Sequence, residues 1–109
     1  MARLRWTEPA LHDLEAVAEY IALDNPVAAR RYVQKVFATV ERLEQFPKLG
    51  SVPPEISHLP YRQLVIPPCR IFYRCATEDV FVIFVMRTEQ LLRDYVLRER
   101  EQALRFRTR

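Results

Sequence analysis

Residues 80–86 read Val-Phe-Val-Ile-Phe-Val-Met, seven apolar side chains in succession. A run of this kind is typical of a central strand that is covered on both faces. Two shorter strand patterns precede it, at residues 61–66 and 70–75, and the intervening Pro67-Pro68 and Thr77-Glu78-Asp79 suit reversals of direction. The sequence therefore predicts a three-stranded antiparallel meander.

Two helical patterns lie upstream of the meander. Apolar side chains recur at helical spacing over residues 8–23, and again from residue 26 until Pro47 and Gly50 stop the pattern. Thr7 and Asn25 stand at the N-cap positions, each followed closely by a proline that suits a first helical turn. Because only about two residues separate the two patterns, the helices are predicted to fold back on each other as an antiparallel hairpin. The alternating residues Arg3–Trp6 predict a short N-terminal strand.

The C-terminal part predicts one more helix. Thr88 suits its N-cap, and one side of it carries Leu91, Leu92, Tyr95 and Val96. From about Arg98 the apolar pattern ends, so residues 98–109 are expected to form a basic tail that frays or awaits a partner. The whole chain, residues 1–109, is expected to be a single α+β domain with an N-terminal strand, a helical hairpin, an antiparallel meander and a C-terminal helix.

The composition of the 109-residue chain excludes several classes of protein. One glycine in the whole chain excludes glycine-rich phosphate loops and dinucleotide-binding fingerprints. Neither an apolar run of about 18 residues nor an apolar N-terminal stretch of signal-peptide length occurs. The histidines and cysteines, at 12, 58, 69 and 75, lack the spacing of a metal site. We expect a cytoplasmic protein with no membrane contact, no metal and no cofactor.

Five segments in a fixed order link the chain to a known family. They are Leu4–Thr7, Asp24–Pro26 with Ala29-Arg30, Phe46–Gly50, Tyr61–Ile66 and Arg70–Arg74. Over residues 4–86 the chain resembles the RelE/ParE toxins of type II toxin–antitoxin operons, and it is closer to ParE. The resemblance implies a cognate ParD-like antitoxin, whose disordered C-terminal segment folds over the toxin in a hetero-oligomer. It also implies an apolar groove with a basic rim, formed by the hairpin and the sheet face, as the antitoxin site.

Two activities occur on this fold. RelE-like members resemble ribosome-dependent mRNA endonucleases, whereas ParE-like members inhibit DNA gyrase and do not cut RNA themselves. Cleavage through a 2′-hydroxyl needs a general base and a general acid. The candidates here are weak: His12 is expected on a helix surface and Tyr95 in helix packing, while Glu55 and His58 lie in a proline-rich connection. After the apolar strand the chain keeps an arginine, Arg87, but lacks the histidine that family members often carry there.

The lack of a convincing general base or acid, and of the histidine after the apolar strand, favours a DNA gyrase inhibitor over an enzyme. No catalytic residue is assigned. One alternative is a RelE-like ribosome-dependent mRNA endonuclease. Another is a degenerate module that binds its antitoxin and has no toxicity. The sequence leaves all three hypotheses open.

Arginines are the candidates for contact with the target or with phosphate groups. Residues 1–86 carry ten basic and ten acidic side chains, so the net charge of +3 arises entirely from residues 87–109. Strand alternation puts Arg70 and Arg74 on one face, and Arg62 joins them if the hairpin register permits. The alternative is that Arg70 or Arg74 pairs with an acidic residue such as Glu78 on a solvated face. The full set of candidates is Arg62, Arg70, Arg74, Arg87, Arg93, Arg98 and Arg100.

Overall fold

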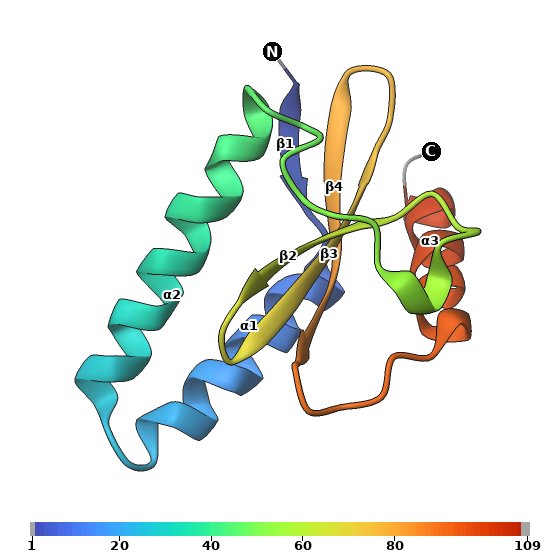
Figure 1. Ribbon diagram of the computed structural model, residues 1–109. Helices are drawn as coiled ribbons and strands as arrows, with labels where there is room; N and C mark the ends of the chain where they lie inside the picture. Colours follow the sequence, from blue (N-terminus) through green and yellow to red (C-terminus); the bar gives the residue numbers. More distant parts are fainter. Residues whose placement is uncertain (1, 108–109) are drawn as a thin grey trace.

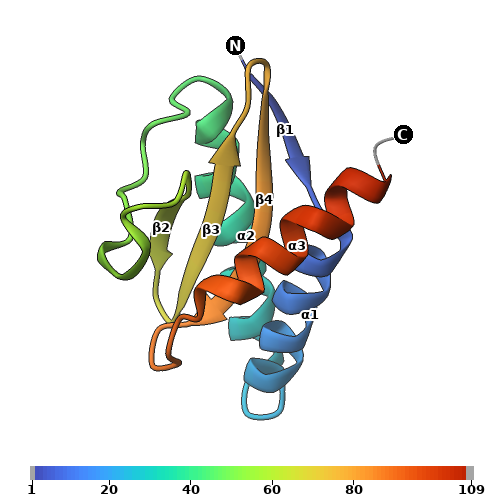
Figure 2. The ribbon, with the colours of Figure 1, turned by 90° about the vertical axis from the view of Figure 1, so that its right-hand side faces the viewer.

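The computed structural model describes residues 2–107 as a four-stranded sheet with a helical hairpin on one face and a third helix on the other (Figures 1 and 2). Two short 3-10 turns, η1 (Arg42–Glu44) and η2 (Pro54–Ile56), lie in the connection between the hairpin and the second strand. Within the described residues no helix is long and apolar enough to cross a membrane. The main elements follow the predicted α+β order: β1 Arg3–Trp6, α1 Glu8–Ala22, α2 Pro26–Glu41, β2 Arg62–Ile66, β3 Cys69–Cys75, β4 Asp79–Arg87 and α3 Asp94–Arg107.

The apolar strand β4 lies inside the sheet, which has the order β1-β4-β3-β2. β2, β3 and β4 form the predicted antiparallel meander, and β1 pairs with β4 in parallel. Both faces of β4 are covered, because Val82 packs in the cluster under the hairpin and Ile83 packs in the cluster under α3. The prediction of a doubly covered central strand is confirmed.

A β-bulge in β4 sets which of its side chains reach each face. Phe72 pairs with Phe84 and Tyr73 pairs with Val82, so Ile83 is the extra residue on β4. Val82 and Val85 therefore both lie in the cluster under the hairpin, although strict alternation would place them on opposite faces. The bulge lets one strand serve two different cores.

Side-chain caps fix where the hairpin helices begin. The Thr7 hydroxyl accepts a hydrogen bond from Ala10 N at 3.3 Å and donates one to the Val82 carbonyl at 2.9 Å, which ties the start of α1 to β4. At the start of α2, Asn25 Oδ1 accepts a hydrogen bond from Ala28 N at 3.0 Å. Each bond satisfies a backbone N–H that has no partner within its own helix. Both predicted N-caps are confirmed.

The loop that follows the hairpin is held against the sheet by the side chain of Tyr73 on β3. The regular helix α2 ends at Glu41 and η1 continues the chain to Glu44, slightly before the predicted stop. The Tyr73 hydroxyl donates to the Pro47 carbonyl at 2.8 Å and accepts from Gly50 N at 2.8 Å. A side chain at position 50 would have no room, because a Cβ there would lie 2.4 Å from the Gln63 carbonyl oxygen.

The C-terminal helix differs from its prediction at both ends. α3 begins at Asp94, so Thr88 is not its N-cap, and Leu91 and Tyr95 are 68% and 56% exposed instead of packed. Among residues 88–103, the buried apolar side chains are Leu92 and Leu97. The helix also runs past Arg98 to Arg107, since side chains of its second half bond to α1 and β3, as described below. Of the predicted tail, residues 108 and 109 lie outside the described residues.

We expect Gly50→Ala to lower the free energy of unfolding by about 1–3 kcal/mol, because the new methyl group must displace the Gln63 carbonyl or the Tyr73 ring. Urea unfolding of the two proteins measures the difference. Lys48→Ala in the same loop is the matched control, because Lys48 is exposed. A Gly50→Ala variant as stable as the control would show that the loop is free to move.

Candidate functional site

Arg70 lies on the face of the sheet that α3 covers, and each of its three guanidinium nitrogens has an acceptor. It donates to both oxygens of Glu55 at 2.8 and 3.0 Å, and to Gln63 Oε1 at 2.7 Å. It also lies 5.0 Å from the centre of the Phe72 ring. The bidentate pair lowers the pKa of the Glu55 carboxyl. These contacts attach η2 to β3. The acid that pairs with Arg70 is thus Glu55, from the proline-rich connection.

Arg74 and the hydroxyl of Tyr61 converge on Glu101. Arg74 Nη1 donates to one carboxylate oxygen at 3.0 Å, and the Tyr61 hydroxyl donates to the other at 3.3 Å. Glu101 is 9% exposed, so the ion pair is partly shielded from solvent. Burial, together with the neighbouring carboxylate, raises the pKa of Tyr61 to about 12. The cluster joins α3 to β3, and its acid is not Glu78, the partner suggested for Arg74 by proximity in the sequence.

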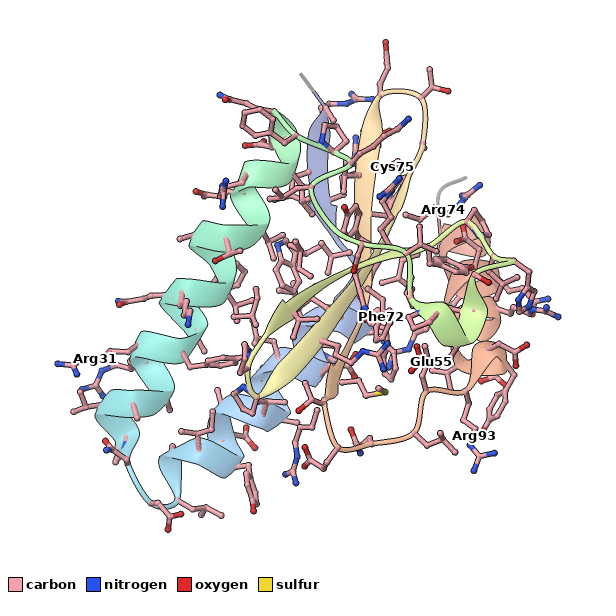
Figure 3. All side chains as sticks on the ribbon, viewed as in Figure 1. Arg31, Glu55, Phe72, Arg74, Cys75 and Arg93 are labelled. Carbon is pink, nitrogen blue, oxygen red and sulfur yellow. The ribbon has the colours of Figure 1, made fainter. Side chains whose placement is uncertain are left out.

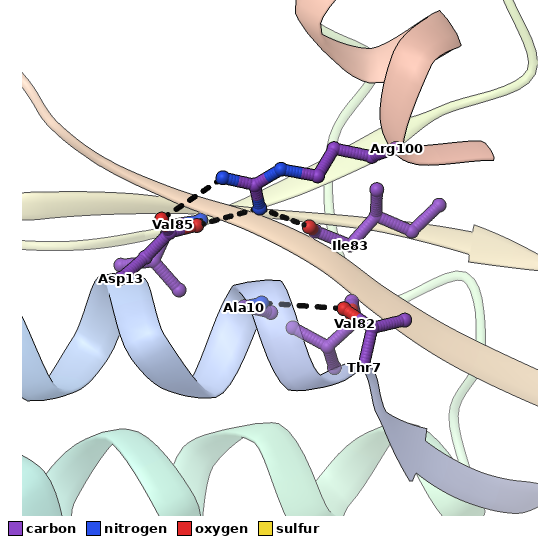
Figure 4. Close-up of polar contacts among 7 residues, drawn as sticks. All are labelled: Thr7, Ala10, Asp13, Val82, Ile83, Val85 and Arg100. Carbon is purple, nitrogen blue, oxygen red and sulfur yellow. Dashed lines mark hydrogen bonds and ion pairs between the residues drawn. The ribbon is translucent and has the colours of Figure 1, made fainter. Parts of the chain in front are cut away.

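Arg100 joins α3 to α1 across β4 (Figure 4). Its guanidinium donates to both oxygens of Asp13 at 2.8 and 3.0 Å, and to the Ile83 carbonyl at 2.9 Å. Asp13 also accepts a hydrogen bond from Val85 N at 3.0 Å. The same guanidinium lies 5.0 Å from the Phe84 ring centre. One carboxylate thus connects the first helix, the central strand and the last helix.

A stacked aromatic pair links two of these arginines. The rings of Phe72 and Phe84 lie 5.8 Å apart with 21° between their planes. Arg70 contacts the first ring and Arg100 the second, each at a cation–π distance. The structure therefore does gather Arg70, Arg74 and Arg100 on one face, with their guanidiniums bound to carboxylates from three different elements.

Arg62 lies on the opposite face, which corrects the prediction that it joins Arg70 and Arg74. The register pairs Arg62 with Tyr73, and residues directly opposite each other share a face. Arg62 therefore points with Tyr73 toward the loop after the hairpin, where it donates to the Gly50 carbonyl at 2.7 Å. Gln63, the neighbour of Arg62, takes the position beside Arg70.

The other three candidate arginines are more accessible. Arg87, at the end of β4, pairs with Glu89 and lies 4.6 Å from the Tyr20 ring centre. Arg98 on α3 forms a loose surface ion pair with Asp94 at 3.7 Å. Arg93, just before α3, is exposed and forms no ion pair with another residue of the described range (Figure 3). Arg93 and Arg98 are the candidates whose charge is most available to a partner.

Sequence reasoning missed the acids that bind the arginines. Asp13 belongs to the first helical pattern, Glu55 to the proline-rich connection and Glu101 to the predicted tail, and no partner was predicted for any of them. The local sequence gives no signal for these pairs, since Arg100 and Asp13 are 87 residues apart. The one available hint is spacing, because Glu101 follows the buried Leu97 by one helical turn and so shares its face.

The residues considered for proton transfer are dispersed. His12 is exposed on α1, as predicted, and His58 is exposed between η2 and β2. Tyr95 was predicted to pack but is exposed. Within residues 2–107, no group of three or more histidines, cysteines or acids is placed to hold a metal ion. An acid, a hydroxyl and two guanidiniums do meet at a hollow of about 290 Å³, whose lining includes Tyr61, Arg74, Arg98 and Glu101.

An apolar groove lies between the two helices of the hairpin. It has a volume of about 500 Å³, and its floor consists of Ala18, Ala22, Ala29 and Val33. The resemblance implies a groove with a basic rim between the hairpin and the sheet face, whereas this groove is lined by residues of the two helices alone. Glu15 and Glu19 of α1 border the groove, together with Arg30 of α2, so that one wall is acidic and the other basic.

Comparison with known proteins matches most of the chain. A family model described as the ParE toxin of the type II toxin–antitoxin system matches residues 4–92. The toxin-named protein Y4kP of Sinorhizobium fredii is 37% identical over 81% of this chain and 90% of its own length. Toxin RelE2 of Caulobacter vibrioides is 30% identical over 84% of this chain and its full length. A solved chain of a chromosomal ParDE toxin–antitoxin system from P. aeruginosa superposes with a TM-score of 0.68 at 29% identity, covering 82% of this chain and 98% of that one.

We expect Asp13→Ala to destabilise the protein by about 1–3 kcal/mol, because it leaves the guanidinium of Arg100 and the N–H of Val85 without their acceptor. Hydrogen exchange should show faster exchange in α3, and urea unfolding should give the free energy. Arg98→Ala is the control, since an exposed pair contributes about 1 kcal/mol at most. Equal effects of the two substitutions would contradict the anchoring role of Asp13.

The Glu55–Arg70 pair should make stability depend on acid pH. Folding lowers the pKa of Glu55 below its ordinary value of 4.5. The ion pair therefore stabilises the folded protein fully at a pH above 4.5, and this stabilisation is lost as the pH falls through the lower pKa of the folded state. The urea midpoint of the native protein should therefore fall more between about pH 5 and pH 3 than that of Glu55→Gln. Glu55 is 38% exposed, so the difference should stay below about 1 kcal/mol. Identical pH profiles would exclude this contribution.

Proposed function

This chain belongs to the ParE toxin family of type II toxin–antitoxin systems, and we propose that it acts by binding and inhibiting DNA gyrase. We propose further that a cognate ParD-like antitoxin neutralises it in a hetero-oligomeric complex. A gyrase target would require the protein to act in the cytoplasm, and we propose that location as well.

The main support for gyrase inhibition over RNA cleavage is that the clustered arginines are already paired with acids of the protein itself. A nuclease needs cations that are free to meet a phosphate, beside groups that can take up and release protons. Arg70, Arg74 and Arg100 instead bond to carboxylates of the protein itself. They stabilise the fold, and this arrangement favours a protein that binds its target over one that cleaves RNA.

The RelE-like endonuclease has one observation in its favour. The hollow at Tyr61, Arg74, Arg98 and Glu101 brings a hydroxyl, a carboxylate and two guanidiniums together. Both oxygens of Glu101 are already bonded, however, and a Tyr61 pKa of about 12 keeps that hydroxyl protonated at neutral pH. The Glu101 carboxylate would have to break its ion pair with Arg74 before it could act as a general base. A module that only binds antitoxin is the third alternative, and absence of toxicity would identify it.

The exposed arginines of the C-terminal segment are our candidates for contact with gyrase. Arg93 lies on the side of the molecule that is remote from Arg31 on α2 (Figure 3), and Arg98 is exposed on the adjoining helix α3. Accessible guanidiniums suit the recognition of carboxylates or phosphates, and charges of this kind mainly affect association rate and specificity. Arg87 contributes less, because Glu89 and Tyr20 already contact it.

We expect the purified protein to inhibit gyrase supercoiling at micromolar concentration, and to leave mRNA intact in a translating extract. The double variant Arg93→Ala/Arg98→Ala should inhibit about tenfold less, because two accessible charges are lost from the contact surface. Arg31→Ala, which removes an exposed arginine on the opposite side, should inhibit as the unaltered protein does.

Three results would contradict parts of this proposal. Unaffected gyrase together with loss of mRNA in the extract would support the endonuclease, and Glu101→Gln should then abolish cleavage. Inhibition that survives the double substitution would exclude Arg93 and Arg98 as the contact. Cells that tolerate the chain without any antitoxin would indicate the non-toxic binding module.

A further inference from the structure

The charges of the hairpin are divided between its two helices. Every charged residue of α1, from Glu8 to Glu19, is acidic, whereas α2 carries Arg30, Arg31 and Lys35 and one acid near its end, Glu41. In contrast to the arginines under α3, Glu15, Glu19 and Arg30 form no ion pair with each other or with another residue that the structure describes. The groove they border is apolar and open on the outside of the hairpin.

An open apolar groove between an acidic helix and a basic helix is complementary to itself. A two-fold symmetric contact places the same patch of both molecules face to face. If the two-fold axis runs along the groove, it brings the acidic α1 of one molecule over the basic α2 of the other. An axis across the groove would bring α1 over α1 and repel, so the charges select the first arrangement.

We propose that the outer face of the α1–α2 hairpin binds a second copy of this chain, forming a two-fold symmetric dimer with an antiparallel four-helix core. The inference is independent of the gyrase hypothesis, since it rests on the hairpin alone. The small side chains of the groove floor allow the helices of the two molecules to approach closely. Leu23 and Val27, at the turn of the hairpin, are exposed and adjoin the groove residues Ala22 and Pro26 in the sequence.

The symmetry also fixes which charges meet. Rotation about an axis parallel to the helices keeps each residue at the same height along the groove. Glu19 and Arg30 both line the part of the groove near the turn between α1 and α2. Glu19 of each molecule therefore faces Arg30 of the other, which gives two equivalent ion pairs per dimer. Both ion pairs flank an apolar floor, where water is partly excluded and the attraction is stronger than on an open surface.

Charge reversal tests this contact without altering the core. Analytical ultracentrifugation should give a species of twice the 13.0 kDa mass for the unaltered protein, over a range of about 1–100 µM. Glu19→Arg and Arg30→Glu should each weaken association at least about tenfold, because each places like charges opposite one another. An equimolar mixture of the two variants should dimerise again, since in the mixed dimer both contacts are attractive.

Matched controls carry the same charge changes elsewhere. Glu99→Arg and Arg93→Glu alter exposed residues of α3 and its approach, and both should dimerise as the unaltered protein does. Circular dichroism and thermal unfolding verify that every variant is folded. Restoration by mixing separates a contact between molecules from one within a molecule, because charges reversed on separate chains cannot compensate each other internally.

Several outcomes would overturn the proposal. A protein that stays monomeric at all concentrations contradicts it, as do variants that dimerise normally or fail to recover on mixing. If the groove instead receives a helix of the antitoxin, the free chain is monomeric and Glu19→Arg weakens antitoxin binding; that result also excludes the second copy as occupant.

Discussion

The structure depends on the burial of β4 on both faces. A strand with seven successive apolar residues cannot leave either face in water, so the sheet needs a cover on each side. The hairpin supplies one cover from two amphipathic helices. The other cover is α3, a charged helix in which Leu97 is the fully buried apolar residue among those at 94–103, where burial is described. Ion pairs to α1 and β3 fix the position of this helix on the sheet.

This constraint explains why Arg70 and Arg74 of β3 and Arg100 of α3 are bonded inward. Arg100 reaches over β4 to Asp13, Arg74 reaches up to Glu101, and the Phe72–Phe84 stack lies between the flanking guanidiniums. Partly buried ion pairs add little net stability compared with apolar packing, but removing one partner leaves a charge without compensation. Arginines that appear in the sequence as a binding surface are therefore chiefly the means by which the last helix is attached.

Local signals in the sequence predicted the elements well, while long-range partners could not be predicted. Thr7 and Asn25 fix helix starts through bonds to residues three positions on, and the pattern of residues 80–86 needs no partner to be recognised. The face of Arg62, in contrast, depends on the β2–β3 register. The extent of α3 depends on Asp13, which lies at the other end of the chain. Thr88 is not a cap, because α3 begins only at Asp94, and Leu92 is the one buried residue between Thr88 and Arg93.

The two helical layers differ in whether their charged side chains are paired within the molecule. Under α3, acids and arginines come from different elements and neutralise one another within the molecule. On the hairpin, acids and bases are segregated by helix and separated by an apolar groove. Folding satisfies the first set, because its partners are brought within about 3 Å of each other. The second set is exposed to solvent, and Glu15, Glu19 and Arg30 form no ion pair with another residue that the structure describes, so these charges remain available to another molecule. The hairpin is thus the part of this toxin fold where electrostatic complementarity is left for association.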